Sequence, residues 1–328
     1  MTKQHKLIIL FFCLIKLTLH LIADSHSGFQ GDELLHIETG NHLAFGYMEF
    51  PPLIGVIAFI QNLLGSNSVY INHLFVHLSS LLIIIYVAKS TLELGGKSRA
   101  LFLTLLCVII APAFGRTQQL FQPVVFSQLF WVLGFYQLIR YTKYLDRKYL
   151  TYLTICAVIG FLFKYDMLFF IFGLLSLLFF KRTRETLLKQ QIGLYIVIAF
   201  LVILPNVYWQ YKNDFPVFQM FSRLYETQLD KLSRIYTFKN LILAINPISL
   251  ILILPALVYM FKSNKTELYK PLALSIIVSF LLLLLSNGKS YYFFPIILTI
   301  LPFGGIFWEQ KGIQNRNGWF ILLHYYCF

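Results

Sequence analysis

Residues 271–287 read PLALSIIVSFLLLLLSN, an apolar run that contains no charged side chain. An α-helix needs about 20 mostly apolar residues to cross the hydrocarbon core of a bilayer. Runs of this kind recur along the chain and give eleven candidate spans: residues 7–23, 69–91, 99–114, 123–140, 149–163, 165–180, 190–208, 239–261, 271–287, 291–308 and 318–328. The sequence therefore predicts an all-α polytopic membrane protein.

The composition supports the same fold class. Hydrophobic residues make up 58% of the 328 residues and charged residues 12%, and the mean hydropathy is +0.70. Soluble domains carry about 25% charged residues. The length alone would favour two soluble domains, but this composition excludes them. We expect a single integral-membrane domain over residues 1–328.

The formal net charge of +13 falls on one side of the predicted topology. Lys and Arg concentrate in the cytoplasmic loops of membrane proteins. If the N-terminus is cytoplasmic, the segments on its side hold 18 of the 27 basic residues and five of the 14 acidic ones: residues 1–6, 89–99, 140–148, 181–189, 262–270 and 309–316. The outer side is then neutral. The charge thus reports topology, which removes the reason to expect nucleic-acid binding.

The first and last apolar runs can each be interpreted as something other than a full transmembrane span. Residues 7–23 could be the h-region of a signal peptide, but Ile22-Ala23-Asp24 is a poor cleavage site, so we expect a retained anchor. Residues 318–328 are too short to cross a bilayer, so we expect a truncated C-terminus or a half-inserted segment. The four cysteines lie in apolar segments, and we expect them to be free thiols.

Five segments place polar side chains at the outer membrane boundary. A first outer loop, residues 24–68, is rich in acidic residues and histidines, and a second covers residues 209–238. Three short corners contain Arg116, Lys164 and Lys289. Charged groups that persist near membrane depth are usually functional. The sequence therefore predicts a site on the outer face.

Two helices are predicted within the first outer loop. Residues 32–45 show an amphipathic pattern, and a second apolar stretch at residues 53–64 follows Pro51-Pro52. The second stretch is too short for a full span, so we expect it to lie in the interface or to re-enter the membrane. Such helices suit a protein that handles a substrate with one end in lipid.

The adjacent carboxylates of Asp32 and Glu33 would point about 100° apart on a helix. One could act on a substrate while the other caps the helix or forms an ion pair, or both could simply favour the positive N-terminal end of their helix. The i, i+4 pairs Asp32/His36 and Glu38/His42 could ligate a metal. A third ligand at clear spacing is lacking, so we expect neither a metal nor another cofactor.

Two motifs in the first outer loop resemble a known family. Residues 31–34, GDEL, and residues 46–53, GYMEFPPL, look like the first extracytoplasmic loop of GT-C glycosyltransferases. The most similar branch is the protein-mannosyltransferase-like family, which includes the aminoarabinose transferases that act on lipid A. Residues 288–295, GKSYYFFP, resemble a later corner of that family, and residues 205–210 and 213–216 are also similar.

This resemblance implies a GT-C bundle of about 10–11 transmembrane helices. It also implies a polyprenyl-phosphate (or dolichyl-phosphate) sugar donor and transfer to a hydroxyl or phosphate acceptor at the outer face of the cell membrane. The catalytic aspartate of the family maps onto Asp32, and the acid before the double proline maps onto Glu49. Some relatives carry a lysine where this chain has Phe50.

Such a reaction assigns roles to the remaining residues. A polyprenyl phosphate leaving group needs cations, for which Lys289, Arg116 and Lys164 are the candidates; snorkelling to the interface is the alternative. The acceptor needs one base in an inverting displacement, and we assign this role to Asp32, assisted by Glu33 or Glu49. Three tyrosines could contact the sugar or the prenyl chain, and a place in the interfacial aromatic belt is the alternative for each: Tyr47, Tyr291 and Tyr292.

Two other classes of function remain open at the level of sequence. A multi-pass transporter or lipid-linked sugar flippase would favour inverted repeats and broken helices at the midplane. The chain shows no such repeat, and its charges gather at one face instead of mid-span. A membrane scaffold without catalysis is the third reading.

Overall fold

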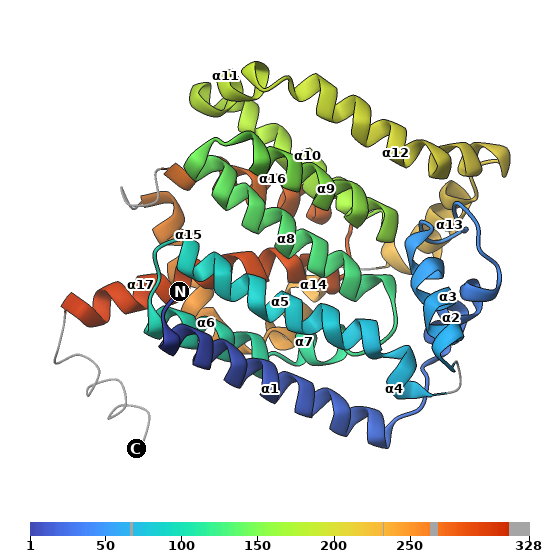
Figure 1. Ribbon diagram of the computed structural model, residues 1–328, viewed down its shortest axis with the longest axis horizontal. Coiled ribbons are helices and arrows are strands. Elements are labelled where there is room, and N and C mark those ends of the chain that lie inside the picture. The colour runs from blue at the N-terminus through green and yellow to red at the C-terminus, as the bar shows by residue number, and fades with distance from the viewer. Residues whose placement is uncertain (66–67, 232, 263–267, 315–328) are drawn as a thin grey trace.

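The computed structural model describes residues 1–65, 68–231, 233–262 and 268–314. All regular structure in this part of the chain is helical, and most helices run back and forth along the long axis of the molecule (Figure 1). The first half comprises α1 Lys3–His26, α2 Gly31–Glu38, α3 Leu53–Gly65, α4 Val69–Asn72, α5 Leu74–Glu93, α6 Ser98–Ile110, α7 Pro112–Arg116, α8 Pro123–Tyr144 and α9 Arg147–Phe163.

The second half continues the bundle with shorter and more interrupted helices. They are α10 Met167–Leu174, α11 Lys181–Lys189, α12 Ile192–Lys212, α13 Pro216–Leu224, α14 Arg234–Ala244, α15 Leu250–Lys262, α16 Lys270–Leu285 and α17 Phe294–Gln314. Short 3-10 turns occur at Thr39–Asn41, Leu175–Phe179, Pro247–Ser249 and Ser290–Phe293, and a π turn at Tyr225–Leu229.

The ten predicted spans that end by residue 308 all coincide with helix, but not all are continuous. Among the described residues, four helical segments are long and apolar enough to cross a membrane: Lys3–His26, Leu74–Glu93, Ile192–Lys212 and Ser290–Gly312. A fifth is obtained if Arg234–Ala244 and Pro247–Phe261, which meet at 91°, form one span. The predicted run at 318–328 lies outside the described residues.

Proline explains one of the interruptions. The predicted run at 99–114 divides into α6 and α7 at Ala111, whose backbone is extended, with ψ of 115°. Pro112 disfavours helical geometry at the residue before it and supplies no N–H to the ladder. α6 is consequently shorter than a full span, and α3 and α16 are further apolar helices of less than full length.

The core lies around α8, which is buried on most of its surface. The Trp131 and Phe135 rings of α8 pack against Phe170 of α10 with centroids 5.4 Å and 4.9 Å apart. At Gly134 an added Cβ would lie 2.7 Å from the Phe170 ring, so glycine is needed for this approach. These contacts join the α8/α9 hairpin to α10.

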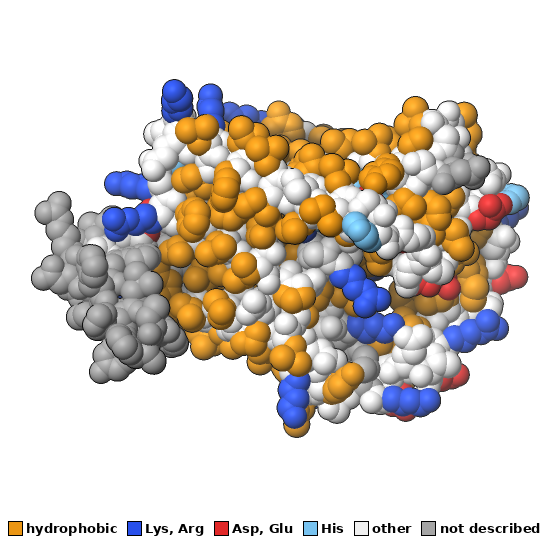
Figure 2. Space-filling model, turned by 90° about the horizontal axis from the view of Figure 1, so that it is seen from below, with side chains coloured by type: hydrophobic (Ala, Val, Ile, Leu, Met, Phe, Trp, Pro, Cys, Tyr) orange, Lys and Arg blue, Asp and Glu red, His pale blue; other side chains and the backbone are white. Residues whose placement is uncertain are grey.

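The outer helices expose their apolar side chains. α12 is almost wholly unburied along its apolar length, and α1 exposes leucines along one side. Hydrophobic side chains cover much of the face in Figure 2, whose acidic side chains lie mostly toward the right end. A long helix that is apolar and unburied is what a bilayer accommodates and water does not. The protein is therefore a multi-pass membrane protein.

Residues predicted to share a membrane side lie at the same end of the bundle. At the end that carries the N-terminus, Lys143 Nζ lies 2.8 Å from Glu93 Oε1, and Glu309 accepts hydrogen bonds from the amides of Lys97, Arg99 and Ala100 at the start of α6. The opposite end carries α2, α3, α4 and α13 (Figure 1). We call it the α2 end.

The two outer loops are more structured than their polar composition indicates. The helix predicted at 32–45 ends earlier, at Glu38, and a 3-10 turn follows. There Gly40 packs so closely on α3 that a Cβ would lie 2.6 Å from the Ala58 backbone. The predicted stretch at 53–64 is α3. Residues 209–238 are mostly helical, since they hold the end of α12, α13 and the start of α14.

Candidate active site at the α2 end

Asp32 and Glu33 diverge at the start of α2. Asp32 is exposed, whereas Glu33 is completely buried. Glu33 Oε2 accepts the Gln30 amide at 2.8 Å, and Oε1 lies 2.6 Å from the Phe121 amide and 2.7 Å from His73 Nε2. Burial alone would raise the pKa of Glu33, but these hydrogen bonds outweigh it and lower the pKa. Glu33 is thus an ionised anchor for α2, whereas the exposed Asp32 carboxylate has only a 3.5 Å contact, from its Oδ2 to Gln122 Nε2.

Lys289 shares its electrostatic environment with Asp32 and Lys164. It stands between α16 and the turn at Ser290–Phe293, with its Nζ 2.5 Å from Gln228 Oε1. Burial and the positive charge of Lys164 lower the pKa of Lys289, and the negative charge of Asp32 partly opposes this. Three segments far apart in the sequence therefore bring their charges close enough to act on one another.

Lys164 ends α9 beside Asp166. Its Nζ lies 3.1 Å from Asp166 Oδ2, and Asp166 Oδ1 accepts a hydrogen bond of 2.7 Å from Ser127. The ammonium also lies over the rings of Tyr292 and Tyr291, at 4.3 Å and 5.0 Å from their centroids. Among the described residues it makes no well-aligned hydrogen bond. Lys164 is therefore a mostly buried cation with N–H donors to spare.

A cavity of about 410 Å³ opens beside this cation. Its polar side is formed by Glu49, Lys164, Asp166 and Tyr292. The rest is largely apolar and comes mostly from α10, α13 and α16: Leu168, Phe169, Phe172, Met220, Phe221, Leu224, Leu229 and Leu283. A smaller cavity of about 230 Å³ is lined by Lys289, Ser290 and Tyr291. A cation next to an apolar pocket fits an amphiphile with an anionic head.

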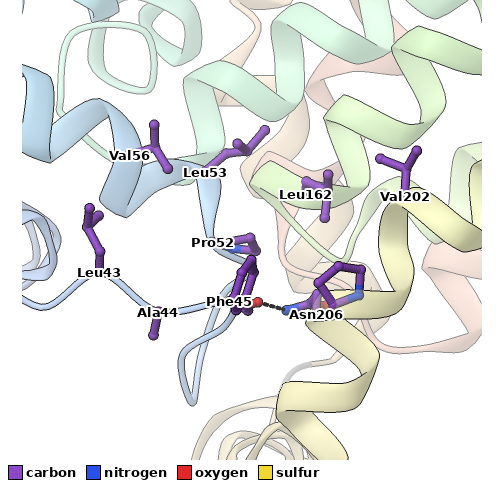
Figure 3. A pocket seen from close by; sticks show the side chains of 10 residues that line it. Leu43, Ala44, Phe45, Pro52, Leu53, Val56, Leu162, Val202 and Asn206 are labelled. Atoms are coloured by element: carbon purple, nitrogen blue, oxygen red, sulfur yellow. Dashed lines mark hydrogen bonds between the residues drawn. The ribbon is translucent and has the colours of Figure 1, made fainter.

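A second apolar cavity, of about 390 Å³, lies between the first outer loop and α12 (Figure 3). Leu43, Phe45 and Val202 are among its lining residues. Asn206 of α12 donates a hydrogen bond of 2.8 Å to the Phe45 carbonyl at its edge. Gln210, one turn further on, contacts both the Tyr47 carbonyl and the Tyr165 hydroxyl at 3.0 Å. These hydrogen bonds from α12 hold the first outer loop against the helix bundle.

Two of the residues singled out in the sequence stand apart from the charged group. Arg116 is exposed at the end of α7 and lines neither the 410 Å³ nor the 230 Å³ cavity. The Tyr47 hydroxyl lies 3.1 Å from the His42 carbonyl and 3.2 Å from that of Thr39, so it braces the loop. Gly55 leaves room for this ring, since a Cβ there would collide with the hydroxyl.

The histidine pairs predicted in the loop do not form a ligand set. His36 is buried against the Phe50 ring, and burial lowers its pKa to about 4. Glu38 and His42 pair at 3.2 Å in an exposed position.

Sequence reasoning missed a buried cluster beneath α2. Asp24 Oδ1 and Oδ2 lie 2.8 Å and 2.7 Å from His73 Nδ1 and His77 Nε2, and His77 Nδ1 lies 3.0 Å from His20 Nδ1. Burial alone would lower the pKa of His73, but hydrogen bonds to Glu33 and Asp24 outweigh it and raise the pKa. The i, i+4 spacing of His73 and His77 could have indicated that the two rings share one helix face, but both residues stand at the start of an apolar run.

These features define an all-α, multi-pass membrane protein with charged side chains beside an apolar cavity at one end of its bundle. The model of the dolichyl-phosphate-mannose-protein mannosyltransferase family matches residues 50–209, which include α3 to α9 and most of α12. No curated protein sequence matches the chain.

Two solved structures share the fold. ArnT from Cupriavidus metallidurans bound to undecaprenyl phosphate superposes with a TM-score of 0.71 at 17% identity, and ArnT in the apo state with 0.69 at 16%. Each match covers 91% of this chain and 59% of the ArnT chain. The chain therefore shares the fold of ArnT, and just under half of it matches the family model; it spans a little under two thirds of the ArnT length.

Proposed function

We propose that the protein is an integral-membrane glycosyltransferase. It transfers a sugar from a polyprenyl-phosphate carrier to a hydroxyl or phosphate of an acceptor on the extracytoplasmic face. The observation that carries this proposal is the cavity at the α2 end. There the ammonium of Lys164, which lacks a well-aligned hydrogen bond, adjoins an apolar lining. The charges of Lys164 and Asp32 both act on the nearby Lys289. The family model and the ArnT fold support the same class of enzyme.

Lys164 and Lys289 bind the donor phosphate in this account. An ammonium with free N–H donors makes short, strong hydrogen bonds to phosphate oxygens. The charge that builds on the departing phosphate is stabilised best where the cation is already held in place and partly desolvated, as Lys164 is. The apolar wall formed by α10 and α13 takes the first isoprene units. Arg116 has no place in this donor site.

Asp32 acts as the general base. It takes the proton from the acceptor hydroxyl as that oxygen attacks the anomeric carbon, and the bond from this carbon to the phosphate oxygen breaks with inversion. A single working carboxylate is sufficient for this route. Glu33 positions Asp32 by fixing α2. Glu49, exposed at the cavity edge, is placed to orient the acceptor.

The membrane orientation in this account follows from charge. The basic segments predicted to be cytoplasmic gather at the end opposite α2. Under the positive-inside rule that end faces the cytoplasm, which sets the site on the extracytoplasmic face.

The proposal is tested by incubating the purified protein with radiolabelled polyprenyl-phosphate sugars and measuring release of free polyprenyl phosphate. We expect release that depends on an added acceptor. Reconstitution into vesicles provides the contrasting result: movement of intact donor across the bilayer with no release would make the protein a flippase and overturn the proposal.

A further inference from the structure

Asp24, His73 and His77 form a compact, buried group that sugar transfer does not use. Asp24 lies near the end of α1, and the two histidines stand at the start of α5. One ligand atom from each residue lies within 4.8 Å of the others. Their side chains are 0%, 1% and 6% exposed.

Each imidazole of the group has two different neighbours. One nitrogen of each ring faces an Asp24 oxygen, while the other faces a further polar group: Glu33 for His73, and His20 for His77. Histidines that ligate metals have this property, because the nitrogen that does not bind the ion donates its N–H to a carboxylate or another acceptor, which fixes the ring. Gln119 Nε2, 3.1 Å away, orients Asp24 in the same way.

Without a metal ion the two carboxylates depend on the protonation of one shared imidazole. Both nitrogens of His73 face carboxylate oxygens, so both must be protonated to satisfy two ionised carboxylates. The nearby Lys16 ammonium of α1 donates to the Phe114 carbonyl, and His20 Nε2 has no partner among the described residues. A divalent ion between Asp24 and the two rings would neutralise the buried carboxylates directly.

We propose that Asp24, His73 and His77 bind one divalent first-row transition metal, with zinc as the expected ion. Two imidazoles and a carboxylate are ligands that suit zinc and its neighbours. A tetrahedral ion with ligands at about 2.0–2.2 Å separates the ligand atoms by roughly 3.3 Å. The present oxygen–nitrogen distances of 2.7 and 2.8 Å would widen by about half an ångström to admit it.

Metal binding must release a proton, because a ligating imidazole nitrogen offers its lone pair to the ion. His73 gives up the proton on Nδ1 and keeps the one on Nε2, which it donates to Glu33. His77 frees Nε2 for the ion and carries its proton on Nδ1, toward His20. The ion would then join α1 to α5 and, through Glu33, to α2. Its role is to hold the first outer loop in place, independently of whichever sugar the enzyme transfers.

The test is the metal content of the full-length protein purified in detergent without chelators. We expect close to one zinc per chain by plasma mass spectrometry, removable by a chelator, and visible absorption after Co²⁺ is added in its place. His73→Gln and Asp24→Asn should abolish both signals. His42→Gln, which alters an exposed histidine of the same loop, is the matched control and should retain both.

Replacing one proposed ligand by another metal-binding residue distinguishes loss of the metal site from misfolding of the variant. His77→Cys supplies a different metal ligand at the same position, and it should retain Co²⁺ with an added thiolate absorption band. Wild-type protein that stays metal-free after incubation with Zn²⁺ and Co²⁺ would overturn the proposal. So would a folded His73→Gln/His77→Gln double variant that still holds one metal per chain.

Discussion

At the scale of single residues, the site depends on charges that are held in place before substrate arrives. Lys164 is kept by Asp166 and by the rings of Tyr291 and Tyr292, yet it retains free donors. The charges of Lys164 and Asp32 act in opposite directions on the pKa of Lys289. The two lysines have different surroundings, so we expect them to respond differently to substitution and to pH.

Replacing Lys164 by Met should weaken binding of polyprenyl phosphate by about 10- to 100-fold, because a charge-assisted hydrogen bond contributes about 1.5–3 kcal/mol. The dissociation constant can be measured by titrating the purified variant with the lipid. Lys148→Met removes an exposed lysine from the other end of the bundle and should change nothing. Equal affinities for Lys164→Met and wild type would exclude Lys164 from the donor site.

The lowered pKa of Lys289 predicts that donor affinity is lost at a lower pH than the titration of a free lysine would give. A lysine with a lowered pKa loses its charge at a lower pH than a free lysine, which titrates near pH 10.4. The KM for donor should therefore rise as the pH increases through this lowered pKa. Lys289→Arg keeps its charge throughout that range and should remove the rise. An identical pH profile in wild type and Lys289→Arg would contradict this reading.

At the scale of elements, α2 is set by contacts that reach across the chain. Glu33 joins the loop to His73, 40 residues away, and to the Phe121 amide, 88 residues away. The sequence predicts α2 and α3 because their patterns are local. It does not predict that Glu33 is buried, because that depends on how α1 and α5 bring Asp24, His73 and His77 together.

Glu33→Ala should destabilise the protein and lower its activity. The change leaves the His73 Nε2–H and the Phe121 amide without their buried partner, and removing one half of a buried charged pair costs about 3–5 kcal/mol. The melting temperature in detergent, followed by circular dichroism, measures the effect. Glu38→Ala, on the exposed side of the same helix, is the control and should melt like wild type. A Glu33→Ala variant as stable as Glu38→Ala would show that Glu33 does not anchor α2.

At the scale of the whole molecule, the sequence predicts helix positions better than helix continuity. Helix is found at every predicted span up to residue 308, because burial in lipid and burial in protein both require apolar residues. The break at Ala111 and the 91° bend near Pro247 depend on local backbone geometry and on tertiary packing. The convergence of Asp32, Lys164 and Lys289 is likewise a property of the assembled bundle.

The orientation can be tested with two single-cysteine substitutions at exposed positions. Glu38→Cys lies at the α2 end and Arg182→Cys in α11 at the other end. If the basic end faces the cytoplasm, as the positive-inside rule favours, a membrane-impermeant maleimide should label Glu38→Cys in intact cells and Arg182→Cys only after permeabilisation. The reverse pattern would place the site on the cytoplasmic face.

Asp32 is proposed as the base of sugar transfer at the α2 end, and the substitution Asp32→Asn tests this role. Asn preserves the shape of the side chain but cannot accept the acceptor's proton. Asp214→Asn, an exposed carboxylate in the turn after α12, is the matched control, and its left-handed backbone suits Asn. We predict that Asp32→Asn loses at least about 100-fold of the rate of polyprenyl phosphate release, with normal membrane insertion and metal content, while Asp214→Asn keeps it. Near-normal release by Asp32→Asn would contradict the account.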